Sequence, residues 1–254
     1  MKKRREHFEL PISITRALFA LVVVATVGFM AWQVVVSPNF MLLGEIVPRV
    51  STSQKVVALT FDDGPLPKHT EETLTILRRH RVQATFFVIG KEARKHQKQL
   101  REIVAASHAV GNHSYSHIPL VLTTPKNVAQ EIESTDDLIR AAGYQGTIPF
   151  RAPYGTKLIS LPWYLARHNR VDVSRDVLPV EGRSRSARQI TQDVVNSVQP
   201  GSIILLHAMY DHTASSRAAL PSIIGKLHSK GYRFVTVPEL LQMRQQNLNQ
   251  HGII

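Results

Sequence analysis

The stretch VVALTFDDGP at residues 56–65 decides the fold of this chain, because an apolar strand runs directly into two acidic residues and a turn. Residues 56–61 are a short apolar, β-branched run that predicts a strand. Asp62 and Asp63 end that strand, and Gly64-Pro65 marks the turn that follows. The pattern therefore places two carboxylates at the carboxyl end of the first strand.

Similar apolar runs recur along the chain, separated by longer amphipathic segments. The expected strands lie at 56–61, 84–89, 109–112, 148–151, 170–174, 202–207 and 233–237, and the expected helices at 69–80, 91–107, 125–142, 159–168, 187–198, 215–229 and 238–246. Seven strand–helix alternations favour an α/β fold with a mainly parallel sheet, which a barrel closes without exposed edges. With 254 residues, 43% of them hydrophobic, we expect one catalytic domain at 55–246 and a tail at 247–254.

Titratable residues gather where these strands end. His113 follows the third expected strand, Arg151 ends the fourth and His207 ends the sixth. Catalytic residues lie at the carboxyl ends of the strands in parallel barrels. We therefore expect these side chains to meet Asp62 and Asp63 in one site.

A metal-binding pattern stands out in His113-Ser114-Tyr115-Ser116-His117. Two imidazoles four residues apart lie on the same side of one helical turn or tight loop, and an aspartate completes a set of two histidines and one carboxylate. The chain has no cysteine, so thiolate sites and disulfides are excluded. Three protein ligands leave a coordination position open for water, which predicts metal-assisted hydrolysis.

The remaining polar residues are assigned by what that reaction needs. Asp63 suits the ligand role, and Asp62 suits a base that takes a proton from water. Arg151 offers a planar guanidinium that orients the base. His207 is the best proton donor for a departing amine, and Asp176 is the carboxylate that we expect to hold its ring.

Four motifs together carry a resemblance to a known family. TFDDGP, HSYSH, RAPYG and LLH, in this order and spacing, resemble the polysaccharide deacetylase family, the NodB-homology domain of carbohydrate esterase family 4. The resemblance covers roughly residues 55–241. It implies an incomplete (β/α)7 barrel and the removal of acetyl groups from N-acetylglucosamine units of peptidoglycan or chitin-like oligomers.

The resemblance also implies roles for individual residues. Asp63, His113 and His117 hold one divalent ion, most often Zn²⁺ and sometimes Co²⁺ or Ni²⁺, while Asp62, Arg151 and His207 act as base, orienting cation and acid. The backbone N–H of Tyr154 resembles the family's oxyanion donor, and Leu205 resembles the residue that lines the acetyl-methyl pocket. Independently of the resemblance, Pro153 marks a turn and shapes the rim of the substrate site. One motif departs from the pattern, since Val177 follows Asp176 where the family commonly has tryptophan.

The amino-terminal segment predicts a membrane anchor. Residues 17–36 contain no charge and are long enough to cross a bilayer core of roughly 30 Å. Basic residues crowd the preceding segment 1–16, so the positive-inside rule leaves the amino terminus in the cytoplasm and the catalytic domain outside the cell membrane. A cleaved signal peptide is the rival interpretation, but the apolar run is long and lacks a good cleavage site. Residues 37–54 are the expected linker.

Charge and composition leave several partners and functions open. The chain carries a formal net charge of +12, which suits acidic envelope glycan or lipid headgroups better than nucleic acid. General solubility explains the charge equally well. Two alternatives to a glycan deacetylase stay open: a deacylase or deformylase of a lipid-linked aminosugar, and a non-catalytic glycan-binding envelope protein. The oligomeric state is unknown.

Overall fold

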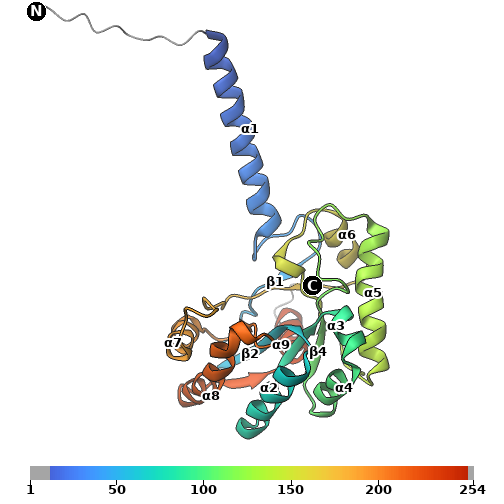
Figure 1. Ribbon diagram of the computed structural model, residues 1–254, viewed down its shortest axis with the longest axis vertical. Coiled ribbons are helices and arrows are strands. Elements are labelled where there is room, and N and C mark those ends of the chain that lie inside the picture. The colour runs from blue at the N-terminus through green and yellow to red at the C-terminus, as the bar shows by residue number, and fades with distance from the viewer. Residues whose placement is uncertain (1–11, 251–254) are drawn as a thin grey trace, which may run out of the picture.

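Strand β2, Val56–Gly64, runs through the centre of the sheet, and all nine of its residues are buried. The computed structural model describes residues 12–250 (Figure 1). Strand β2 pairs in parallel with β3, Thr85–Val88, and with β6, Ser202–Leu206. Parallel strands are covered on both faces, which is why this strand is apolar along most of its length.

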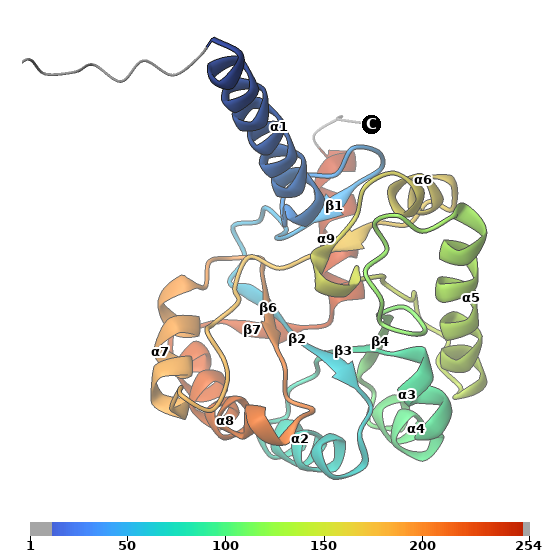
Figure 2. The same cartoon turned by 45° about the horizontal axis from the view of Figure 1, so that its top comes forward.

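Helices and strands alternate along the rest of the chain. The helices are α1 Ile12–Val36, α2 Pro67–His80, α3 Gly90–Lys95, α4 Gln97–Ala105, α5 Pro125–Ala141, α6 Ser160–Arg167, α7 Ala187–Ser197, α8 Ala214–Ser229 and α9 Val237–Gln250, with short 3₁₀ turns η1 Pro153–Gly155 and η2 Asp211–Thr213. The other strands are β1 Ile46–Val47, β4 Ala109–Asn112, β5 Asp172–Val173 and β7 Arg233–Val235. Figure 2 shows helices α2 to α8 arranged around the outside of the strands, while α1 projects away from them.

The sheet curves into an incomplete barrel. Its main strands follow the order β4-β3-β2-β6, with β7 also beside β2 and with β1 paired to β5. The hydrogen-bonded pairing continues from β4 through β5 and back to β6 by isolated bridges at Asn112–Phe150, Phe150–Asp172 and Val177–Ile204. The incomplete barrel that the motifs implied is therefore confirmed.

Some elements differ from the sequence-based expectation. The expected strand at 148–151 is reduced to the bridge at Phe150, because Pro149 has no N–H to donate to a ladder. The expected helix at 91–107 is divided at His96, whose backbone has φ −120° and ψ 49°. The expected linker at 37–54 contributes β1 and buries Val47 and Val50 against the domain.

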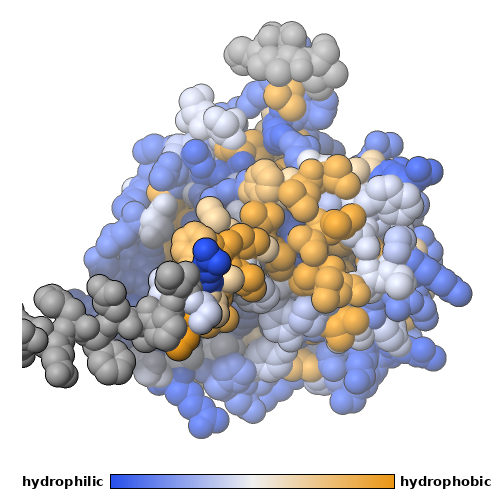
Figure 3. All heavy atoms as spheres, turned by 90° about the horizontal axis from the view of Figure 1, so that it is seen from above, coloured by the Kyte–Doolittle hydropathy of each residue, from blue (hydrophilic) through white to orange (hydrophobic). Residues whose placement is uncertain are grey.

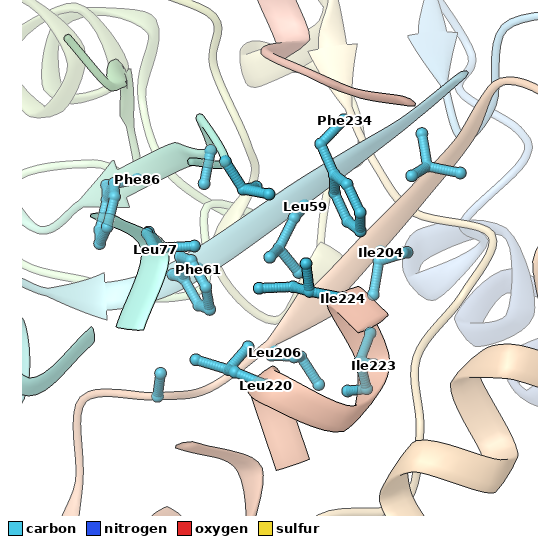
Figure 4. Close-up of a cluster of buried hydrophobic side chains, with 14 of the residues drawn as sticks. Leu59, Phe61, Leu77, Phe86, Ile204, Leu206, Leu220, Ile223, Ile224 and Phe234 are labelled. Carbon is cyan, nitrogen blue, oxygen red and sulfur yellow. The ribbon is translucent and has the colours of Figure 1, made fainter. Parts of the chain in front are cut away.

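Alternation along β2 decides what each residue faces. Val57, Leu59 and Phe61 pack outward in a core shared with α8 (Figure 4). Ala58 lies on the opposite face, in a second core with Phe87 and Val235. Because side chains alternate along a strand, Asp62 shares the inner face with Ala58. The period of the strand therefore directs one carboxylate into the barrel.

Helix α1 projects away from the domain (Figure 1). Residues Ser13–Val36 are long and apolar enough to cross a membrane, and only 6% of their most apolar window is buried. Figure 3, seen from above, shows that apolar side chains cover this helix and the surface at its base. Of the expected basic segment 1–16, residues 1–11 lie outside the described residues, as do 251–254 of the expected tail.

The end of α1 is fastened to the domain. Val35 is buried, and its carbonyl accepts a hydrogen bond from the backbone N–H of Lys157 at 3.0 Å. The Lys157 ammonium donates to the carbonyls of Ser37 at 2.7 Å and Gly155 at 3.0 Å. The apolar helix is thus joined directly to the turn η1.

Candidate active site

The two aspartates at the end of β2 have different surroundings. Asp62 points into the barrel, whereas Asp63 adopts a positive φ of 72° that turns it toward the histidine loop. The Oδ1 atom of Asp63 is buried, and no group in residues 12–250 forms a hydrogen bond with it. A buried carboxylate oxygen with no donor is costly, so this atom is well suited to bind a cation.

Two histidines converge on that oxygen. The Nε2 atom of His117 lies 3.2 Å from Asp63 Oδ1, and the Nε2 atom of His113 lies 3.7 Å from it. The ligand atoms of Asp63, His113 and His117 all lie within 4.8 Å of one another. Burial and the neighbouring His113 lower the pKa of His117, which favours the neutral imidazole that a metal requires. This donor set fits one divalent ion such as Zn²⁺.

The histidine loop is fixed by residues behind it. His113 Nδ1 lies 2.8 Å from the carbonyl oxygen of Arg151, so its N–H donates there and leaves Nε2 facing Asp63. Glu131 on α5 accepts hydrogen bonds from the backbone N–H groups of Tyr115 and Ser116. These contacts hold both rings in place before any ion binds.

Asp62 forms a buried ion pair with Arg151. The Arg151 Nη1 atom donates to Asp62 Oδ1 at 2.6 Å, and its guanidinium stacks over the Phe87 ring at 3.9 Å. Burial alone raises the pKa of Asp62, but the charges of Arg151, His113 and His207, with the hydrogen bond from Arg151, together outweigh it and lower the pKa below its ordinary value. Asp62 is therefore an ionised carboxylate beside the metal-binding set, which is the placement that a base requires.

His207 is held by Glu181, and the expectation that Asp176 holds it is wrong in this structure. His207 Nδ1 lies 2.6 Å from Glu181 Oε2, and Glu181 also accepts from the His207 backbone N–H. Asp176 instead accepts from Ser202 Oγ at 2.7 Å and from the Ile203 backbone N–H at 2.8 Å. Asp176 precedes the bridge between Val177 and Ile204, so it caps the start of β6 rather than reaching its end.

The charge on His207 follows from this arrangement. Burial disfavours the protonated ring, but the hydrogen bond to Glu181 and the charges of Asp62, Glu181 and Asp63 outweigh it and raise the pKa of His207 to about 9. The Nε2 atom lies 3.9 Å from Asp63 Oδ2, on the cavity side of the ring. His207 is thus protonated at neutral pH and aimed at the site.

These groups line one cavity of about 190 Å³. Tyr154 and Leu205 form part of its wall, and Pro153 is buried in η1 at the rim. The backbone N–H of Tyr154 has no hydrogen-bond partner in the described chain. Val177 is buried against β6, and the exposed Leu178 lines the wall beside it. An aliphatic side chain, rather than an aromatic ring, forms that part of the wall.

Comparison with known proteins agrees with this geometry. The family model described as polysaccharide deacetylase matches residues 49–170. A peptidoglycan-N-acetylglucosamine deacetylase of Bacillus cereus is 37% identical over 192 residues, which cover 75% of this chain and 70% of the relative. The chain belongs to the polysaccharide deacetylase family.

Other members of the family extend the likeness. A chitooligosaccharide deacetylase of Sinorhizobium fredii is 36% identical over 204 residues, covering 76% of this chain and 95% of the relative. A crystal structure of a peptidoglycan N-acetylglucosamine deacetylase in complex with 4-naphthalen-1-yl-N-oxidanyl-benzamide has a TM-score of 0.73 at 34% identity, covering 77% of this chain and 92% of that chain.

Strained backbone marks the site of this polysaccharide deacetylase. Four of its non-glycine residues have positive φ values: Asp63 at 72°, Ser114 at 61°, His117 at 57° and Tyr154 at 55°. Each such residue costs free energy on the order of 1–3 kcal/mol and persists where the surroundings hold it. These strained residues lie in the turns that orient the ligand side chains and the unpaired backbone N–H of Tyr154.

Sequence reasoning missed three residues of the site. Glu181 lies in a segment without a motif, and only the fold brings it to His207. Glu131 lies among other acidic residues of α5, a pattern that is typical of a solvent-exposed helix face. Arg175 lines the cavity next to Ser174 and belongs to none of the sequence motifs. The sequence points to Glu181 only as an acidic residue in the segment that follows a strand. The same description fits Asp176.

Proposed function

We propose that this chain is a membrane-anchored, metal-dependent hydrolase that removes N-acetyl groups from N-acetylglucosamine units of envelope glycan, either peptidoglycan or a chitin-like oligosaccharide. One observation carries the proposal: a three-residue ligand set, an arginine-paired carboxylate and a glutamate-paired histidine face one cavity. A protein that only binds glycan has no use for this combination. The names of the relatives support the same substrate class.

The side chains divide the reaction between them. When bound at Asp63, His113 and His117, a divalent ion supplies Lewis acidity that polarises the acetamide carbonyl and makes water more acidic. Asp62 accepts a proton from the attacking water, and Arg151 keeps that carboxylate oriented. The Tyr154 N–H donates to the oxygen that becomes negative. His207 then donates its proton to the amine nitrogen as the carbon–nitrogen bond breaks and acetate leaves.

The anchor places this chemistry at the outer face of the cell membrane. Helix α1 has the length and apolarity of a single span, and the positive-inside rule leaves the segment before it in the cytoplasm. The end of the span lies beside the turn that carries Tyr154, because Lys157 follows that turn and donates hydrogen bonds to the end of α1 and the residue after it. The catalytic cavity is therefore held near the bilayer surface.

That proximity favours one second candidate, a deacylase of a lipid-linked aminosugar. Both candidates use the same residues and differ only in the substrate. The test is acetate release by the full-length protein in detergent with Zn²⁺, from purified peptidoglycan and from N-acetylglucosamine oligomers. Acetate that a chelator abolishes supports the proposal. A protein that binds one metal per chain and releases acetate from neither substrate points to the lipid-linked candidate.

A further inference from the structure

Arg175 is a cation in the wall of the catalytic cavity that the reaction does not use. It follows β5 and is half-buried beside Ser174, whose hydroxyl accepts a hydrogen bond from Nη1 at 3.2 Å. A Cβ atom added to Gly155 would lie 3.5 Å from the same Nη1 atom. The guanidinium therefore lies against the turn that carries Tyr154.

Among the residues that the structure describes, the charges around the cavity are paired except for that of Arg175. Ion pairs join Arg151 to Asp62 at 2.6 Å, Lys157 to Asp172 at 3.8 Å and His207 to Glu181 at 2.6 Å. Within the described part of the chain, no carboxylate forms an ion pair with Arg175. Its positive charge is available to a group that enters from outside.

The surroundings make that charge costly without a partner. Burial lowers the pKa of Arg175, and the nearby charge of Arg151 lowers it further, while Asp62 and Asp172 act in the opposite direction. A guanidinium in such a place is stabilised when a carboxylate or phosphate binds its planar fork with two hydrogen bonds. The net positive charge of the whole chain attracts the same class of ligand.

We propose that Arg175 binds an anionic group, a carboxylate or a phosphate, that the substrate carries next to its acetamido sugar, so that the enzyme prefers acidic to neutral N-acetylated substrates. This inference rests on the proposed function and adds a substrate class to it. Arg175 acts as a specificity residue and takes no part in the proton transfers.

The test compares substrates that differ in charge alone. Glycan strands with the free lactyl carboxylate of muramic acid are one substrate, and the same strands with that carboxylate converted to the methyl amide are its neutral match. N-acetylglucosamine 1-phosphate provides the phosphate, with the neutral methyl glycoside of N-acetylglucosamine as its match. The full-length protein in detergent is assayed with Zn²⁺ as wild type, Arg175→Gln, Arg175→Lys and the exposed control Arg188→Gln.

Arg175→Gln is expected to lower the ratio of kcat/KM for an acidic substrate over its neutral match by about 10- to 100-fold, chiefly through KM. Arg175→Lys restores part of the ratio, and Arg188→Gln does not change it. A ratio that falls only for the carboxylated strands identifies the ligand as a carboxylate, and one that falls only for the sugar phosphate identifies a phosphate. An equal loss on every substrate assigns Arg175 a structural role and overturns the inference, as does an unchanged ratio.

Binding measured by titration calorimetry keeps the two proposals separate. If the wild type releases no acetate from any substrate, the proposed function fails. The inference about Arg175 is then still decided by the Kd for the acidic strands and for the sugar phosphate. A Kd at least tenfold weaker in Arg175→Gln supports it, and equal Kd values in both proteins contradict it.

Discussion

Glu181→Gln is predicted to slow turnover by about 10- to 100-fold and to move the alkaline limb of the pH–activity profile to lower pH. The Glu181 carboxylate lies 2.6 Å from His207 Nδ1 and also accepts from the His207 backbone N–H and from Ser216 Oγ. A hydrogen bond to a charged group contributes about 1.5–3 kcal/mol, which corresponds to that range of rates. The change keeps the shape of the side chain and removes its charge.

The direction of the pH effect follows from the role of His207. His207 must be protonated to donate, so activity falls as the pH rises through its pKa of about 9. Without the charge of Glu181, burial of the ring opposes protonation more effectively and the pKa is lower. The fall in activity therefore begins at a lower pH in Glu181→Gln.

Acetate release across neutral and alkaline pH measures this effect, with Asp176→Asn as the matched control. Asp176 contacts Ser202 and the Ile203 backbone rather than His207. Its amide variant should lose about 1 kcal/mol of stability and keep the wild-type pH profile. An unchanged alkaline limb in Glu181→Gln, together with a shifted limb in Asp176→Asn, would refute the assignment of Glu181.

Three further predictions concern the metal set, the buried lysine and the anchor. Asp63→Ala should lose bound metal and activity together, whereas Asp62→Asn should keep the metal and lose turnover by on the order of 10² to 10⁴; metal analysis with the opposite result would exchange the two roles. Lys157→Met leaves Asp172 buried without its cation and should cost about 3–5 kcal/mol in thermal unfolding near neutral pH. Because burial raises the pKa of Asp172, that cost should shrink in acid, and a pH-independent cost would contradict the pairing. The full-length chain should stay in the membrane fraction after carbonate extraction, and a mature chain that starts near Ser37 would exclude the anchor.

The sequence predicts the parts of this fold that depend on local pattern. Strand β2, the aspartates at its end and the two histidines four residues apart follow from periodicity and spacing, and the structure brings them together. The short strand Ala109–Asn112 matches its expected bounds for the same reason. The sequence is enough to predict an element when the local pattern alone determines its structure.

The parts that the sequence did not predict depend on contacts between distant segments. Residues 37–54 carry no regular strand pattern, yet Ile46–Val47 completes a strand pair with β5. Glu181 and Asp176 are both acidic and both lie in the segment between β5 and α7, and only the bridge from Val177 to β6 directs Asp176 away. The residue types alone do not tell which of the two carboxylates contacts His207, because that contact depends on how the barrel closes.

The most direct test of the account is a zinc titration of metal-free full-length protein, followed by acetate release from peptidoglycan. The account predicts that activity rises with added Zn²⁺ to a plateau at one equivalent per chain, and that Asp63→Ala shows no such rise. Full activity in metal-free protein, or an Asp63→Ala variant that binds and responds to zinc as the wild type does, would contradict it.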